Sequence, residues 1–206
     1  MATDYVLVCV GAFSPISYAH LRMFELAKKR INHVIGGIIH IDRPDFYYDT
    51  YNMAKYATAD IPWLEVFDWQ KSYDFSLDEI LQHYENMLRA MGGKPNLEGQ
   101  HYFNNKDLSN VKVMLLCGSN FLTKFIKNSS NIKIKNVLER GVVVMERNND
   151  NIDEVFDLPF LNEYRNKVFV IRDPVFSNIT QDYIRKQEDT FLTPVNTKTY
   201  EYLDIA

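Results

Sequence analysis

The chain has 206 residues, of which 46% are hydrophobic and 14% aromatic, so it is long and apolar enough to bury a sizeable core. Its formal net charge is −4 and it contains no long run of lysine or arginine, which argues against a nucleic-acid surface as the main partner. Its two cysteines, Cys9 and Cys117, lie in or at the end of apolar runs, where buried reduced thiols are expected rather than a disulfide or a metal site.

The expected reduced cysteines predict an intracellular protein, either cytoplasmic or nuclear. The first predicted strand begins at Tyr5, which leaves no room for a signal peptide, and no apolar stretch approaches the ~18 residues of a membrane span. We therefore expect no membrane partner, while a homo-oligomer stays open. A single domain over residues 1–206 is expected, because no linker, internal repeat or low-complexity tract interrupts the sequence.

The first predicted strand leads directly into a glycine turn and a helix. Residues 5–10 are apolar and stop at Gly11, while Leu21 and Phe24 recur at helical spacing after it. Such a turn places a helix N-terminus beside the carboxyl end of a strand, which is where phosphates bind in α/β folds. Gly11 allows close approach of the backbone, and His20 could donate a hydrogen bond to the same point. An ordinary strand–helix turn with a surface histidine has the same pattern.

Strands and helices alternate along the rest of the chain. Apolar runs predict strands at residues 33–41, 63–67, 111–117, 141–145 and 168–171. Helical spacing predicts helices at residues 51–59, 76–91 and 121–126. Ser76 followed by Glu79 is a capping-box pattern for the second of these helices, which Gly92 should end. Residues 92–110 are expected to form a loop, and the alternation predicts an α/β fold with a doubly wound, mostly parallel sheet of about six strands.

The turn also resembles a known signature. Residues 11–22, Gly-Ala-Phe-Ser-Pro-Ile-Ser-Tyr-Ala-His-Leu-Arg, are similar to the first motif of the nicotinamide/nicotinate mononucleotide adenylyltransferase family, particularly its eukaryotic branch. That motif reads Gly-Ser-Phe-Asn-Pro-hydrophobic-Thr-x-x-His-Leu-Arg, and Ser17 keeps a hydroxyl where threonine is usual. The resemblance implies a Rossmann-like nucleotidyltransferase that transfers the adenylyl group of ATP, with Mg²⁺ accompanying the ATP, to nicotinamide or nicotinate mononucleotide. NAD or deamido-NAD and pyrophosphate would result.

Other segments extend the resemblance over nearly the whole chain. Residues 63–69 are similar to the family's Trp-Val-Glu-Val-x-x-Trp, residues 115–120 to its Leu-Leu-Cys-Gly-Ala-Asp, and residues 191–194 to its Tyr-Leu-Val-Pro. The resemblance assigns catalysis to His20 and Arg185. It assigns ATP binding to Gly11, Ala12, Phe13, His20, Gly118, Asn120, Thr180 and Arg185. It assigns mononucleotide binding to Ser14, Trp69 and Arg147, with Trp69 stacked on the pyridine ring, and it assigns no residue to a protein-held metal.

The second family signature, Ile-Ser-Ser-Thr-x-hydrophobic-Arg, is altered at residues 179–185. Thr180 and Arg185 are kept, but Gln181 and Asp182 replace the second serine and the threonine. A carboxylate facing a triphosphate repels it unless magnesium bridges the two or the side chain turns away as a helix cap. The sequence therefore leaves two alternatives open. One is a catalytically degenerate relative that binds a nucleotide as a sensor or interaction protein, and the other is a nucleotidyltransferase for a different phosphorylated substrate.

Overall fold

A computed structural model describes residues 3–42, 47–67, 75–92, 102–103, 106–146, 152 and 159–172. Their strands form one sheet in the order β3-β2-β1-β4-β5-β6, and every neighbouring pair is parallel. The strands are β1 (Tyr5–Gly11), β2 (Val34–Ile41), β3 (Leu64–Val66), β4 (Lys112–Gly118), β5 (Val142–Glu146) and β6 (Val168–Arg172). The predicted doubly wound sheet of about six strands is confirmed, and β1 and β4 lie side by side at its centre.

The helices connect successive strands as the alternation predicts. They are α1 (Tyr18–Arg30), α2 (Tyr47–Ala57), α3 (Leu77–Met91), α4 (Ser119–Asn128), α5 (Asn131–Arg140) and the short α6 (Pro159–Asn162), followed by a 3-10 turn at Arg165–Lys167. Ser76 and Glu79 form the expected capping box at the start of α3, and Gly92 follows its last residue. The helix predicted at residues 51–59 starts four residues earlier, and α5 was not predicted.

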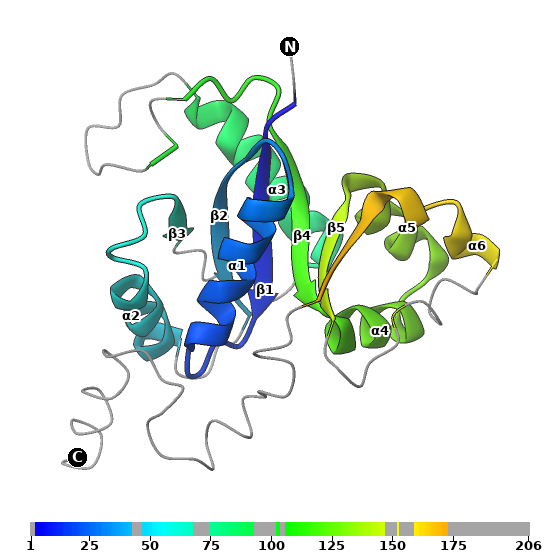
Figure 1. Cartoon of the computed structure of the whole chain (residues 1–206), viewed down its shortest axis with the longest axis horizontal. Helices are drawn as coiled ribbons and strands as arrows, with labels where there is room; N and C mark the ends of the chain where they lie inside the picture. Colours follow the sequence, from blue (N-terminus) through cyan, green and yellow to red (C-terminus); the bar gives the residue numbers. More distant parts are fainter. Residues whose placement is uncertain are drawn as a thin grey trace.

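Two apolar clusters cover the two faces of the sheet. Successive side chains of a strand point to opposite faces, so Leu7 of β1 packs with Phe24 of α1 while Val8 packs with Leu81 of α3 and Leu122 of α4. All five residues from Val6 to Val10 are buried, as expected for a central strand with helices on both sides. Figure 1 shows α1 lying across one face of the central strands.

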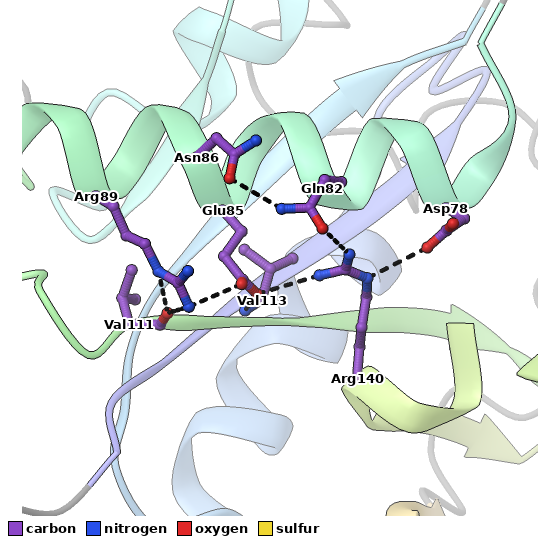
Figure 2. A network of polar contacts seen from close by, with 8 residues as sticks. All are labelled: Asp78, Gln82, Glu85, Asn86, Arg89, Val111, Val113 and Arg140. Atoms are coloured by element: carbon purple, nitrogen blue, oxygen red, sulfur yellow. Dashed lines mark hydrogen bonds and ion pairs between the residues drawn. The ribbon is translucent and has the colours of Figure 1, made fainter. Parts of the chain in front are cut away.

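A polar network joins α3 to the beginning of β4 and the end of α5 (Figure 2). Pairing between β4 and β5 starts only at Leu115, so the backbone just before it has no strand partner on that side. Glu85 accepts a hydrogen bond from the Val113 amide at 3.2 Å, and Arg89 donates to the Val111 carbonyl at 3.2 and 3.3 Å. Side chains of α3 therefore take the place of the missing part of the neighbouring strand.

Arg140, the last residue of α5, completes this network. Its guanidinium donates to Asp78 at 3.3 Å, to Glu85 at 3.2 Å and to Gln82, all on α3. The Arg140 and Glu85 side chains are only 16% and 11% exposed, so the pair is shielded from most solvent screening. Arg140 thus ties α5 to α3, and α3 in turn holds the beginning of β4 through Glu85 and Arg89.

A second polar contact is buried between β2 and α3. His40 Nδ1 lies 2.7 Å from the hydroxyl of Tyr84, and the two rings meet edge to face with centroids 5.6 Å apart. His40 is 1% exposed, and this burial, with a smaller contribution from His83, lowers the pKa of His40 from 6.5 to about 4. The imidazole is therefore neutral in the folded protein near pH 7.

The cysteines are buried and free, as predicted. Burial raises the pKa of Cys9 to about 12, so this thiol stays protonated near neutral pH. Among the described helices, none combines the length and apolar character needed to cross a membrane.

Candidate functional site

The centre of the sheet contains a point where the chain changes direction. From β1 the chain continues outward through β2 to β3, and from β4 it continues the other way through β5 to β6. The helices that follow the two central strands pack on opposite faces, since α1 contributes to one apolar cluster and α4 to the other. Ligands of open α/β sheets bind in the crevice at the carboxyl ends of such a strand pair. The predicted phosphate turn, residues 11–20, follows β1 and therefore borders the place where this fold class has its ligand crevice.

Phe13 gives the first turn its shape. It is 2% exposed and packs in the apolar cluster beneath α1, and its backbone has a φ of 46°, in the left-handed region. A side chain anchored in the core thus holds a backbone conformation that non-glycine residues seldom adopt. The Phe13 ring also meets the His20 ring edge to face, with centroids 5.2 Å apart. Phe13 therefore supports His20 from below, while Ala12 and Ser14 on either side of it stay partly exposed.

The hydrogen bonds of His20 determine which ring nitrogen carries the proton. The backbone amide of Ser17 donates to His20 Nδ1 at 3.1 Å, and the Ser17 hydroxyl lies 2.9 Å from the same atom. An amide can donate only to a nitrogen with a lone pair, so the neutral ring must carry its proton on Nε2. The start of α1 thus holds a histidine whose Nε2–H can donate to an anion at the helix N-terminus.

The junction of β4 and α4 borders the same place. Gly118 is the N-cap of α4 with ordinary φ and ψ of −80° and 155°, so the backbone does not require glycine there. Among the described residues, no heavy atom lies within 4 Å of a Cβ built at Gly118, so they leave open space beside the helix N-terminus. Asn120, in the first turn of α4, is exposed. This junction offers backbone amides and an amide side chain to a ligand.

Curated relatives of the chain share one description. The chain is 28% identical over 227 residues to nicotinamide/nicotinic acid mononucleotide adenylyltransferase 1 of Bos taurus, an alignment that covers 89% of this chain and 80% of the relative. It is 28% identical over 211 residues to the nicotinamide/nicotinic acid mononucleotide adenylyltransferase of Oryza sativa, covering 88% and 75%. No protein-family model matches it. The chain is a homologue of the nicotinamide/nicotinic acid mononucleotide adenylyltransferases.

The fold agrees with that of solved adenylyltransferases. A Plasmodium falciparum nicotinic acid mononucleotide adenylyltransferase complexed with APC superposes with a TM-score of 0.70 at 16% identity, covering 98% of this chain and 96% of that one. The same parasite enzyme complexed with NaAD gives a TM-score of 0.67 at 16% identity, with the same coverage. The Rossmann-like α/β fold predicted from the sequence is confirmed, and these solved adenylyltransferases share it.

In this adenylyltransferase homologue, the structure brings together one part of the predicted site. The residues that lie at the two strand–helix junctions are Gly11, Ala12, Phe13, Ser14, His20, Gly118 and Asn120. The remaining site predictions, together with the substitutions in the second signature, lie outside the described residues: Trp69, Arg147, Thr180, Gln181, Asp182 and Arg185. For those six positions the sequence-based roles stay predictions.

Sequence reasoning missed the role of Ser17. It noted a hydroxyl at this position of the homologous motif but gave it no function. The backbone amide and the hydroxyl of Ser17 both contact His20, three residues later. The signal was available, because a serine three residues before a polar side chain at a helix start is the capping-box spacing, here with histidine in place of glutamate or glutamine.

Proposed function

We propose that this protein transfers the adenylyl group of ATP to nicotinamide or nicotinate mononucleotide. The products are NAD or deamido-NAD and pyrophosphate. The observation that carries the proposal is the Gly11–His20 turn, which combines the homologous motif with a place at the central crevice of a nucleotidyltransferase fold. The motif and the fold thus indicate the same site. A distant likeness in fold alone would not support a function.

The reaction needs no protein nucleophile. A 5′-phosphate oxygen of the mononucleotide attacks the α-phosphorus of ATP in line, the bond from that phosphorus to the oxygen bridging to the β-phosphate breaks, and pyrophosphate leaves with its electron pair. Positioning and charge stabilisation supply the catalysis. In the proposal the backbone from Gly11 to Phe13 and His20 Nε2–H hold the ATP phosphates, while Arg185 holds the leaving pyrophosphate and Trp69 stacks on the pyridine ring.

Magnesium enters the proposal as part of the MgATP substrate, where it offsets charge on the phosphates. Within the part of the chain that the structure describes, no three His, Cys, Asp or Glu side chains gather as metal ligands. In the proposal, oxygens of the nucleotide hold the ion, and this chain binds and orients the substrates and donates hydrogen bonds to them.

A direct assay of product formation tests the proposal. Purified protein is incubated with MgATP and either mononucleotide, and NAD, deamido-NAD and pyrophosphate are measured by chromatography. We expect product in equal amounts with pyrophosphate, and the ratio of the two kcat/KM values will give the preferred mononucleotide. Binding of ATP without any product would instead support the degenerate relative, and product only with another phosphorylated acceptor would support a different transferase.

A further inference from the structure

A cavity lies at the amino-terminal ends of the strands, opposite to the carboxyl ends at which the phosphate turn lies. It has a volume of about 510 Å³ and is open to solvent between the start of β1, the start of β4, the end of α1 and the β6 strand. In Figure 1 this is the end at which β1 and β4 begin. Tyr5 lines the cavity, whereas Gly11 belongs to the crevice, and the strand between them spans ~20 Å at about 3.3 Å per residue. The two sites are therefore separate.

The charged side chains that line this cavity are mostly basic. Besides Arg140, which is bonded to α3, four basic side chains line the cavity. They come from separate segments of the chain: Arg30, His33, Lys112 and Lys167. Glu139 is the only carboxylate among the described residues of the lining. Charges on a solvated surface are usually mixed in sign, and this chain has a net charge of −4. A local excess of cations therefore indicates a binding site for an anionic ligand.

Two of these cations are not engaged by other side chains or carbonyls in the described part of the chain. The side chains of Arg30 and Lys112 make no hydrogen bond or ion pair with another described residue. Lys167 donates to the carbonyl of Glu139 at 3.3 Å, and His33 lies 3.9 Å from the Asp4 carboxylate. Arg140 also borders the cavity, but its guanidinium is committed to α3. Arg30 and Lys112 are thus the groups available to hold an anion.

Aromatic rings border the same cavity. Phe169 of β6 is 43% exposed, although it points to the same face of its strand as the buried Ile171. Tyr5 at the start of β1 is half-buried, and Asn32 and Asn166 add amide groups. An exposed phenylalanine beside cations offers a stacking surface next to an anion site, and the volume lies within the ~300–1,000 Å³ of small-molecule pockets.

We propose that the cavity between the α1–β2 turn, β4 and β6 is a second binding site, for a phosphorylated aromatic metabolite of mononucleotide size. Arg30 and Lys112 bind the phosphate, and Phe169 stacks on the aromatic ring. The site goes beyond the transfer reaction, because its ligand lies at the amino ends of the strands and cannot reach the crevice.

The proposal is tested by titrating the isotope-labelled full chain and following backbone amide signals by NMR. The probes are AMP, adenosine and inorganic phosphate. We expect AMP to shift the amides of Lys112, Gly141 and Phe169 with saturation, and to bind more tightly there than adenosine or phosphate, since neither probe alone provides both contacts. The double variant Arg30→Gln/Lys112→Gln should weaken this binding about tenfold or more, which corresponds to ~1.4 kcal/mol. Lys29→Gln removes a neighbouring exposed cation outside the lining and should leave it unchanged.

The same spectra separate this proposal from the transfer reaction. If AMP shifts only the amides from Gly11 to His20, the second site does not exist, while the proposed function stands. Equal affinity in the double variant and in Lys29→Gln would also overturn the second site. Saturable shifts at Phe169 in a protein that forms no NAD would uphold the second site and remove the proposed function. Loss of the native spectrum in the double variant would be resolved with Arg30→Gln and Lys112→Gln alone, each expected to weaken AMP binding at Phe169.

Discussion

At the scale of single residues, the proposed function gives two positions different roles toward an anion. His20 provides a hydrogen-bond donor whose tautomer is fixed by Ser17. Gly118 provides space, because no heavy atom of the described chain lies within 4 Å of where its Cβ would be. A donor that is already oriented and a space that is already open cost little reorganisation when charge develops on the phosphates.

Replacing His20 tests the donor. His20→Ala should lower kcat/KM by ~10²-fold or more, about 2.7 kcal/mol of transition-state stabilisation, with little change in melting temperature because the side chain is only half-buried. Ser17→Ala keeps the backbone amide that donates to Nδ1, so we expect a much smaller loss. Steady-state kinetics of both variants provide the measurement. Activity of His20→Ala near that of the parent protein would mean that His20 only caps the helix.

A pair of glycine variants tests the open space. Gly118→Ala should leave the melting temperature nearly unchanged but raise the KM for ATP about tenfold, since the new methyl group enters space reserved for the nucleotide. Gly37→Ala is the contrasting control, because its Cβ would lie 2.5 Å from Cδ1 of Phe24 in the core. That variant should lose ~1–3 kcal/mol of stability through overpacking. If Gly118→Ala binds ATP as the parent does, the nucleotide does not approach this junction.

At the scale of elements, α3 contacts its neighbours through two polar arrangements that differ in kind. The Arg140 network is made of charges at the beginning of β4, whereas the His40–Tyr84 contact is neutral and fully buried between β2 and the middle of α3. A charged network and a neutral pair respond to different perturbations. Each therefore gives its own prediction for stability.

Removing the guanidinium should destabilise the fold. Arg140→Gln leaves the carboxylates of Asp78 and Glu85 without their shared cation, and we expect a loss of ~1–3 kcal/mol in the free energy of unfolding. Lys135→Gln is the matched control on the same helix, since its ion pair with Glu139 is 58% and 48% exposed and should contribute little. Urea denaturation of the two variants measures both values. Equal stabilities would show that Arg140 does not tie α5 to α3.

The buried histidine predicts a dependence of stability on pH. The pKa of His40 is lowered from 6.5 to about 4 on folding, so between these values the unfolded chain binds a proton that the folded chain does not. Unfolding free energy should therefore fall as the pH drops from 6.5 towards 4, by up to ~3 kcal/mol from this group. His83, whose pKa is also lowered, adds in the same direction. His40→Gln should flatten the dependence of unfolding free energy on pH over this range relative to the parent. Parallel curves for the two proteins would contradict the lowered pKa of His40.

At the scale of the whole molecule, the sequence predicts the sheet well and the contacts between distant elements poorly. The unbroken apolar run before Gly11 and the capping pattern at Ser76 are local signals, and both elements form as expected. Residues 131–135, Asn-Ile-Lys-Ile-Lys, alternate polar and apolar residues, which conceals α5 although its buried residues, Ile134, Val137 and Leu138, have helical spacing. No local pattern reveals that Arg140 meets α3, because that contact depends on where β4 begins.

The central pairing of β1 with β4 has a consequence for synthesis of the chain. Tyr5 pairs with Lys112, so one side of the innermost strand waits for its partner until more than half of the polypeptide exists. At roughly 5–20 residues per second, that delay on the ribosome lasts on the order of 5–20 s. During this time β1 can be flanked by β2 but presents an unpaired, apolar edge to other chains. The strand that leads into the phosphate turn is therefore open to pairing with other chains until β4 has been made.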